Sequence, residues 1–214
     1  MEIFMPHLPP SLDKGTLPQE ILWAIEDGEA IRNKSFFSCF SEKYSFVKSD
    51  ISACRFDTCS LAGADFSGTI FNNVVFKDCD LSSSSFNNSF FGRTVFLGCR
   101  LMGARFSSSG FNNVLFEDCT ASYGNFTSCH IEKTILRQSR FVDAVFTEAS
   151  FKQTELEECD LTGADFMHVG LKGCDFTSSM ISGAYFEPLN LRGAIFSPEQ
   201  AVMLIRNLGV IIKE

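Results

Sequence analysis

The sequence predicts an all-β solenoid, and two periodicities carry this prediction. Every fifth residue from Phe36 to Phe196 is large and apolar, except Ser41 and Ala121, and the register never slips. Neither a helix, with a period of about 3.6 residues, nor a strand, with a period of about 2, keeps every fifth residue on one face. The chain must therefore turn once every five residues.

A second set of residues, two places before each large one, is nearly all small, as at Cys59, Ala64 and Thr69. One large and one small inward residue per five-residue side would fill the inside of a narrow coil. The other positions are polar and rich in Gly, Asn, Ser and Asp. These residues tolerate the backbone angles that tight corners require.

The number of sides follows from a longer period. Phe recurs every twenty residues from Phe46 to Phe186, and cysteines share one twenty-residue phase from Cys39 to Cys159. Four sides of five residues therefore make one coil, which predicts a quadrilateral β-helix. Like residues should stack about 4.8 Å apart, the strand spacing of a sheet, in about eight coils and a rod about 40 Å long.

Residues 1–30 do not follow the repeat and are expected to form an N-terminal cap. After a proline-rich lead, Thr16-Leu-Pro-Gln19 is typical of a capping box that starts a short helix, with Gly28 as its end. The open end of a β-helix exposes unpaired backbone and apolar core, so we interpret this helix as a lid. Trp23 is part of the lid or, as the less favoured alternative, a ligand platform.

Residues 31–196 are expected to form the β-helix, with no insertion between Ile51 and Phe186 and so no projecting loop. The first coil is irregular. Pro188 and Leu189 occur where the repeat expects small residues and should distort the last coil. Ala121 leaves a gap in its column, into which Phe141 is expected to lean from the next coil.

Residues 197–214 are expected to form a helix and tail for dimerisation. Ser197-Pro-Glu-Gln200 is a second capping box, the helix should end near Gly209, and residues 210–212 resemble a short strand. A helix that is apolar on several sides must be buried on more than one of them, and a rod end covers only one. A two-fold dimer would supply the second surface. Its expected interface consists of Ala201, Leu204, Ile205, Leu208, Val210, Ile211 and Ile212.

The composition limits the possible functions. The 214 residues carry a formal net charge of -8, with a pI of about 4.9. Direct nucleic-acid binding requires a basic surface, so we do not expect it. The N-terminus has no basic start followed by an apolar run, so we expect no signal peptide. The sequence has no apolar run of about eighteen residues, so we expect no membrane span. We expect a cytoplasmic protein without membrane contact.

All nine cysteines fall at the small inward position, and none forms a C-x-x-C pair. Free cysteines act as small buried apolar residues, so we interpret them as packing residues, with a metal or redox role as the less favoured alternative. The odd count and the absence of an export signal oppose a disulfide framework.

The sequence indicates no catalytic constellation, metal site or cofactor. His7, His130 and His168 are isolated, and the adjacent Glu157 and Glu158 would lie on a rod that offers no cleft. We therefore expect a protein that is not an enzyme.

The charges differ between the sides of the predicted rod. On the side centred at Phe56 and its repeats, Arg55, Lys77 and Arg137 oppose a larger acidic set. This acidic face is the candidate partner-binding surface and contains Asp57, Asp78, Glu117, Asp118, Glu155, Glu157, Glu158 and Asp175. The side centred at Ile51 and its repeats has an excess of basic residues.

The same acidic side carries an outward apolar ladder, Val75, Val95, Leu115 and Ile135, just before the large residues. Exposed apolar residues in a row mark a possible contact strip. Alternatively, β-branched residues simply favour strand geometry here.

Two stretches, Ala64-Asp-Phe-Ser-Gly68 and Asp160-Leu-Thr-Gly-Ala-Asp-Phe166, resemble the A(D/N)LxG repeats of the pentapeptide repeat family. The resemblance covers about three quarters of the chain. It implies a right-handed coil.

The segment from Asn190 to Gly209, in which a last repeat leads into a Gln-Ala helix ending in Leu-Gly, resembles the C-terminus of the Qnr and MfpA group. The resemblance implies a dimeric acidic rod that mimics duplex DNA, binds DNA gyrase and topoisomerase IV, and protects them from quinolones. The missing loops and the long N-terminal cap depart from the Gram-negative Qnr pattern. The alternative is a general interaction scaffold for another protein.

Overall fold

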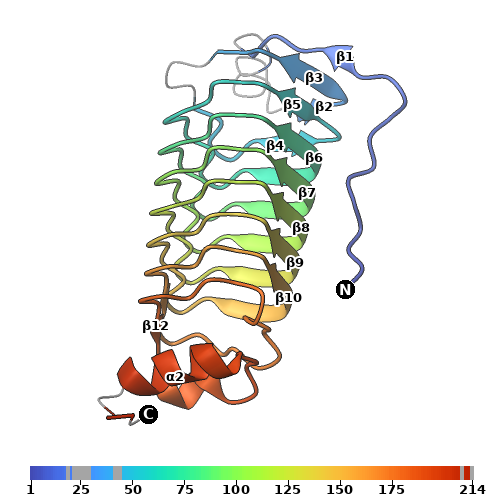
Figure 1. Cartoon of the computed structure of the whole chain (residues 1–214). Coiled ribbons are helices and arrows are strands. Elements are labelled where there is room, and N and C mark those ends of the chain that lie inside the picture. The colour runs from blue at the N-terminus through green and yellow to red at the C-terminus, as the bar shows by residue number, and fades with distance from the viewer. Residues whose placement is uncertain (18–19, 21–29, 41–44, 208–209, 213–214) are drawn as a thin grey trace.

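A computed structural model describes residues 1–17, 20, 30–40, 45–207 and 210–212. The chain forms a rod of stacked coils, with a helix across its C-terminal end (Figure 1). This architecture confirms the predicted β-solenoid of about eight coils. The right-handed sense of the coil stays a prediction.

The strands β1 to β10 form one sheet along the rod, and β11 and β12 form a separate pair. The early coils contain β1 (Asp13–Lys14), β2 (Ile31–Arg32), β3 (Lys34–Phe37), β4 (Asp50–Ser52) and β5 (Arg55–Asp57). The middle coils contain β6 (Ile70–Lys77), β7 (Phe90–Leu97), β8 (Gly110–Glu117), β9 (His130–Arg137) and β10 (Ser150–Glu157). Near the C-terminus lie β11 (Asp165–Phe166), β12 (Tyr185–Phe186), the 3-10 helix η1 (Pro188–Leu191) and the helix α2 (Pro198–Asn207).

The strand pairs are parallel, and their register confirms the twenty-residue coil. Phe71 pairs with Phe91, and Phe91 pairs with Phe111, each one coil further along. The exception is β1, where Asp13 pairs with Lys34. From β6 to β10, a single eight-residue strand spans two sides of the coil.

The corners recur every five residues. In one coil Asn73, Asp78, Ser83 and Asn88 all have positive φ, between 52° and 58°. For residues other than glycine this conformation costs about 1–2 kcal/mol. Each corner N–H donates to a carbonyl one coil further along, as from Asp78 to Leu97 over 2.8 Å. The ladder of hydrogen bonds between coils therefore holds the backbone in this conformation.

Columns of phenylalanine fill the interior. From Phe46 to Phe186, each ring stacks on the ring twenty residues later, with centroids 4.4 to 5.2 Å apart. Burying one such side chain contributes about 1.5–3 kcal/mol. Phe141 lies 6.2 Å from Phe116 and 5.8 Å from Phe126, in the coil before it, so it leans toward the gap at Ala121 as expected.

The small inward residues also form hydrogen bonds, which the packing interpretation did not include. Cys79 Sγ donates to the carbonyl of Phe56 over 3.4 Å, and Cys99 Sγ donates to that of Phe76 over 3.4 Å. Ser109 Oγ donates to the Phe86 carbonyl in the same way, over 2.6 Å. A short side chain with an S–H or O–H group satisfies a buried carbonyl here, which favours Cys, Ser and Thr.

The C-terminal helix α2 begins as the sequence predicts. Ser197 N donates to Gln200 Oε1 over 2.9 Å, and Gln200 N donates to Ser197 Oγ over 3.2 Å, which is a capping box. The strand predicted for residues 210–212 was wrong: these residues, which the structure describes, are in no strand. A single chain brings no strand edge to them. Leu208 and Gly209 lie outside the described residues.

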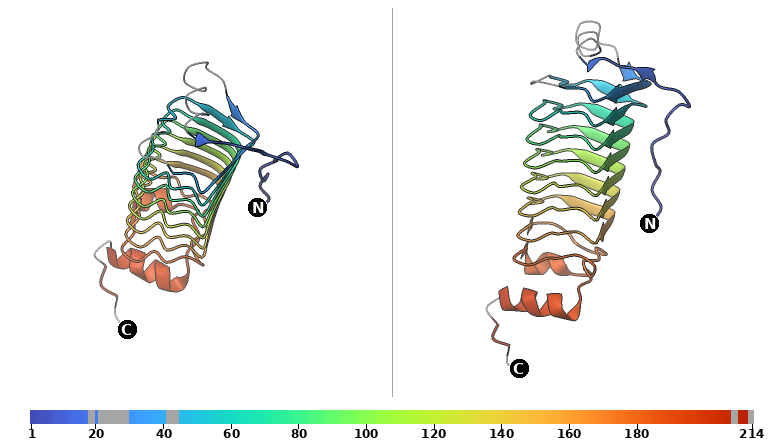
Figure 2. Two further views of the ribbon diagram at one scale, coloured as in Figure 1. Left: turned by 90° about the horizontal axis from the view of Figure 1, so that it is seen from above. Right: turned by 45° about the horizontal axis from the view of Figure 1, so that its top comes forward.

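At the N-terminal end, Leu17 is buried and Glu20 N donates to Thr16 O over 3.1 Å. Most of the expected lid helix, with Trp23 and Gly28, lies outside the described residues. Residues 1–10 lie along the side of the rod rather than over its end (Figure 2). We call these residues the arm.

Candidate partner-binding face

The acidic face follows the second half of each long strand and the corner after it. Its side chains alternate between inward and outward positions, so Glu117 and Glu157 point outward on either side of Arg137. Arg137 Nε lies 2.5 Å from Glu157 Oε2, and its Nη1 lies 3.4 Å from Glu117 Oε1. The hydrogen bond from Arg137 lowers the pKa of Glu157.

Further acids of this face have partners of their own. Arg55 Nε pairs with Asp57 over 2.7 Å, and the amino group of Met1 pairs with Glu155. Thr177 donates to Asp175 through its hydroxyl and its backbone N–H, which lowers the pKa of that carboxyl. Many of the acidic side chains on this face therefore form ion pairs or accept hydrogen bonds within the chain itself.

One corner of the face keeps free acidic charge. Asp78, Asp118 and Glu158 occupy the same corner in alternate coils, each with positive φ. None of the three forms an ion pair with a residue that the structure describes, although Gln138 Nε2 donates to Glu158 over 3.0 Å. This acidic corner is the part of the predicted site that most directly presents charge to a partner.

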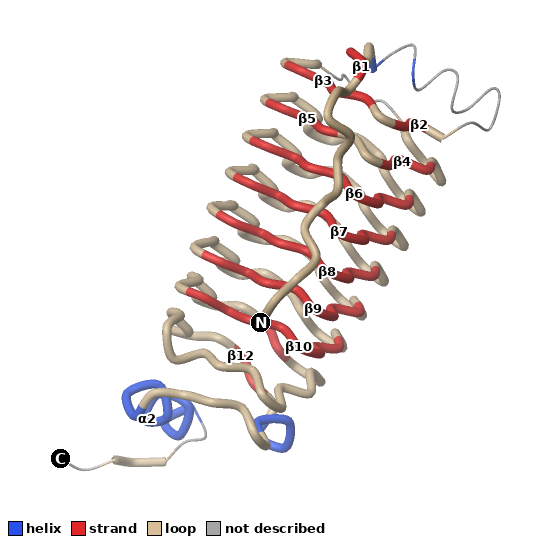
Figure 3. Tube along the Cα trace, turned by 90° about the vertical axis from the view of Figure 1, so that its right-hand side faces the viewer, coloured by secondary structure: helices blue, strands red, loops and turns tan. Residues whose placement is uncertain are grey.

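The apolar ladder is covered, so its description as exposed was wrong. Val95, Leu115 and Ile135 are only 6, 6 and 5 % exposed, and Ile3 of the arm packs against them together with Val75. Figure 3 shows the arm crossing the long strands from β1 toward β10. The contact strip therefore exists, but the chain's own N-terminus occupies it.

Sequence reasoning missed the residues that hold the arm. Phe4 N donates to Asn113 Oδ1 over 3.0 Å, and His7 N donates to Asn73 Oδ1 over 3.1 Å. Both asparagines sit at the same corner, in the middle of β8 and β6. An apolar outward ladder next to an unassigned proline-rich lead was the available clue.

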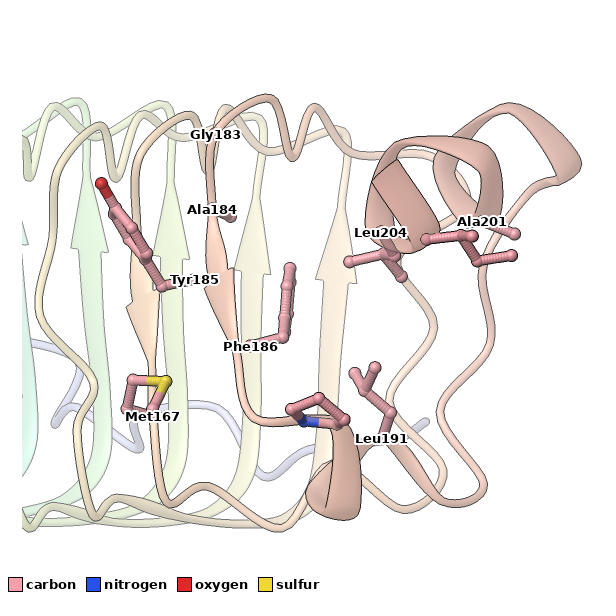
Figure 4. A pocket seen from close by; sticks show the side chains of 10 residues that line it. Met167, Gly183, Ala184, Tyr185, Phe186, Leu191, Ala201 and Leu204 are labelled. Carbon is pink, nitrogen blue, oxygen red and sulfur yellow. The ribbon is translucent and has the colours of Figure 1, made fainter. Parts of the chain in front are cut away.

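A second surface lies between the last coil and α2. A pocket of about 580 Å³ is lined there by Phe186, Leu191, Ala201 and Leu204, among others (Figure 4). Leu204 packs against the core, whereas Ile205 is 42 % and Ile211 86 % exposed. Val210 and Ile212 are also exposed. The predicted interface residues that the structure describes thus gather at the C-terminal end of the rod. Leu208 lies outside the described residues.

The histidines have neighbours that the sequence analysis did not identify. His168 Nδ1 lies 3.0 Å from Glu187, and His130 Nδ1 lies 3.0 Å from Ser150, both on the exposed surface. Within the described ranges, no cluster of three or more His, Cys, Asp or Glu side chains is placed to hold a metal ion.

No helix in the described part of the chain has the length and apolarity needed to cross a membrane.

Comparison with known proteins places these features in context. The family model of the pentapeptide repeat region matches residues 49–120 and 69–146, and that of pentapeptide repeats (8 copies) matches residues 139–177 and 159–197. A search of curated proteins gave no match.

Among solved structures, the chain is similar to trypsin-treated QnrB1 M102R, a plasmid-mediated fluoroquinolone resistance protein. The TM-score is 0.64 at 26% identity, over 87% of this chain and 91% of that one. Full-length QnrB1 gives a TM-score of 0.57 at 25% identity, over 95% and 99% of the two chains. HetL of the cyanobacterium Nostoc sp. strain PCC 7120 shares the fold, with a TM-score of 0.53 at 13% identity, over 83% and 93%.

Proposed function

This chain belongs to the pentapeptide repeat family, and from this we propose that it is a non-enzymatic rod that binds DNA gyrase or topoisomerase IV through its acidic face. The observation that carries the proposal is the similarity to QnrB1, a fluoroquinolone resistance protein, over most of both chains. Protection of the topoisomerase from fluoroquinolones is the activity that this similarity suggests.

The proposed recognition depends on shape more than on charge. Duplex DNA carries one negative charge per about 1.7 Å of its axis. On this rod the free charges of the acidic corner, such as Asp78 and Asp118, recur only at every second coil, or about 9.6 Å. A straight rod with a modest acidic edge would therefore enter a DNA-binding channel mainly because it fits.

We also propose that the chain forms a two-fold dimer through its C-terminal end. Ile205, Ile211 and the other exposed apolar side chains beside α2 form one patch. A second copy would cover the same patch on both chains at once. The resulting rod would be about 80 Å long.

The test is DNA supercoiling by gyrase, with and without a fluoroquinolone, as the protein is titrated. Neutralising the acidic corner with Asp118→Asn and Glu158→Gln should raise the half-effective concentration about two- to thirty-fold, because each exposed charge contributes about 0.2–1 kcal/mol. The matched control is Asp143→Asn with Glu148→Gln, two exposed acids with the same positive φ at other corners, which should change it less than about two-fold.

The topoisomerase proposal would be refuted if micromolar protein neither inhibited supercoiling nor rescued it from the fluoroquinolone. The second candidate function, a scaffold for another protein, is favoured by the covered apolar ladder, which is a contact surface independent of charge. Recovery from a lysate of one specific partner other than a topoisomerase would support it.

A further inference from the structure

The arm does not extend the β-sheet. Residues 1–10 are in no strand, and they cross β6 to β10 instead of lying beside an edge (Figure 3). Their backbone N–H groups reach side-chain amides, those of Asn113 and Asn73, rather than strand carbonyls. This mode of binding is therefore distinct from β-augmentation.

The arm and the solenoid share a register. Met1, Phe4 and His7 are three residues apart, and they contact Glu155, Asn113 and Asn73, each about two coils from the next. A polyproline II chain advances about 3.1 Å per residue, so three residues span about 9.3 Å, against about 9.6 Å for two coils. One residue in three can therefore meet equivalent positions of the solenoid.

The burial of the arm follows this period in part. Ile3, Pro6 and Pro9 are half-buried, as is Leu8, whereas Phe4 and Met5 are 68 and 52 % exposed. Polyproline II has three residues per turn, and proline favours it by fixing φ. Ile3, Pro6 and Pro9 therefore recur every third residue along the arm, and Ile3 packs on the apolar ladder.

The arm is held in this site by few contacts. Ile3 is the arm side chain that packs on Val95, Leu115 and Ile135, and the largest arm side chain, Phe4, is exposed. The polar contacts are two hydrogen bonds and one ion pair with Glu155, whose side chain is 34 % exposed. A ligand with the same pattern can compete, because few contacts must be broken to release the arm.

We propose that the ladder, with Asn73, Asn113 and Glu155, is a binding site for polyproline II segments, and that the arm occupies it in cis. The partner is a proline-rich segment of another protein. It places an aliphatic or proline side chain on the ladder at every third residue, N–H groups on the two asparagines, and a cation at Glu155. The carboxylate of Glu155, which pairs with the amino group of Met1, selects the cationic end. This inference does not depend on the topoisomerase proposal.

The experiment uses a synthetic peptide of residues 1–12, with a fluorophore at its C-terminus, and measures fluorescence anisotropy. A chain that lacks residues 1–10 should bind the peptide saturably, and the full-length chain should bind it at least ten-fold more weakly, because its own arm fills the site. Leu115→Asp in the truncated chain should weaken binding at least ten-fold. Ile70→Asp, at an exposed apolar residue outside the ladder, should change it less than two-fold.

Two further reagents isolate the register and the fold. A peptide with one glycine inserted after residue 4 keeps every original residue but breaks the three-residue spacing, and should bind at least ten-fold more weakly. The full-length variant Ile3→Asp with Pro6→Asp releases the arm without shortening the chain, so it should bind the peptide more tightly than the unaltered chain. It replaces the truncated chain if that chain fails to fold. No saturable binding by either folded protein, or equal binding of the glycine-inserted peptide, would overturn the proposal.

Discussion

The small inward residues show how single side chains stabilise a coil. Most of the cysteine thiols are buried and bonded to a backbone carbonyl, as Cys159 Sγ is to Leu136 O over 3.2 Å. Burial raises the pKa of Cys54 and Cys159 from the ordinary value of 9.0 to about 11, and that of Cys129 to about 12. The thiolates are disfavoured because no water or cation solvates them.

These thiols should make the folded chain less stable in alkaline solution. A thiol with a higher pKa in the folded chain holds its proton more tightly there. Its contribution is therefore complete below about pH 9 and is lost as the pH rises through about 11. The denaturant midpoint should fall between pH 8 and pH 10.5. A variant with Cys54, Cys129 and Cys159 changed to Ser keeps the donors, and should show a smaller fall; an equal fall in both proteins would contradict the assignment.

At the scale of the element, α2 is held by two different devices. The capping box supplies hydrogen-bond acceptors for free N–H groups at the start of the helix. Gln200 Nε2 also donates to the carbonyls of Phe176 and Ser179, each over 2.8 Å. These carbonyls belong to the last coils, and the Phe176 carbonyl also accepts from Ser179 N over 2.9 Å. Since an isolated helix of this length is marginal in water, these contacts decide whether α2 stays docked.

Replacing Gln200 with Leu removes its bonds to the coil as well as its half of the capping box. It should therefore undock the helix more readily than Ser197→Gly, which removes only the hydroxyl of the cap. We expect a cost of about 1–3 kcal/mol, because the Ser179 carbonyl loses this donor and the Phe176 carbonyl keeps only the N–H of Ser179. Ser197→Gly, a tolerated replacement at an N-cap, should cost only about a few tenths of a kcal/mol. Hydrogen exchange of the α2 amides reports both. Faster exchange in Ser197→Gly than in Gln200→Leu would rule out this account.

At the scale of the whole molecule, each coil contacts mainly its neighbours, so the two ends of the rod are independent. The N-terminal arm is the exception. Its ion pair joins Met1 to Glu155, across most of the solenoid. Because the contacts between coils are local, changes at the C-terminal patch should affect assembly without affecting the repeats.

Ile205→Asp with Ile211→Asp should convert the proposed dimer to a monomer, because both side chains are exposed in the single chain and would be buried only by a second copy. These positions test assembly better than Leu204, which also packs on its own coil. Light scattering should show half the mass of the unaltered protein and circular dichroism an unchanged spectrum. Ile70→Asp is the matched control. A monomeric unaltered chain at micromolar concentration would disprove the dimer.

The sequence alone predicted the coil, the number of sides and the capping box of α2, because each depends on residues close in the chain or one coil apart. A fixed five-residue spacing repeats the same local geometry, so Phe106 and Phe126 meet without any information from elsewhere. For the candidate face, the sequence predicted which charged residues lie on it, but not which of them form ion pairs. Which acids remain free was decided by side-chain geometry, as where Arg137 joins Glu117 and Glu157.

Only the tertiary structure decided what covers the apolar ladder. Ile3 and Leu115 are far apart in the chain, and the arm has no five-residue repeat to set its position. Its place follows from a match between the rise of an extended chain and the spacing of coils, which exists only once the solenoid has formed. The sequence contained both partners of this contact, but their meeting depends on long-range packing, which no local period encodes.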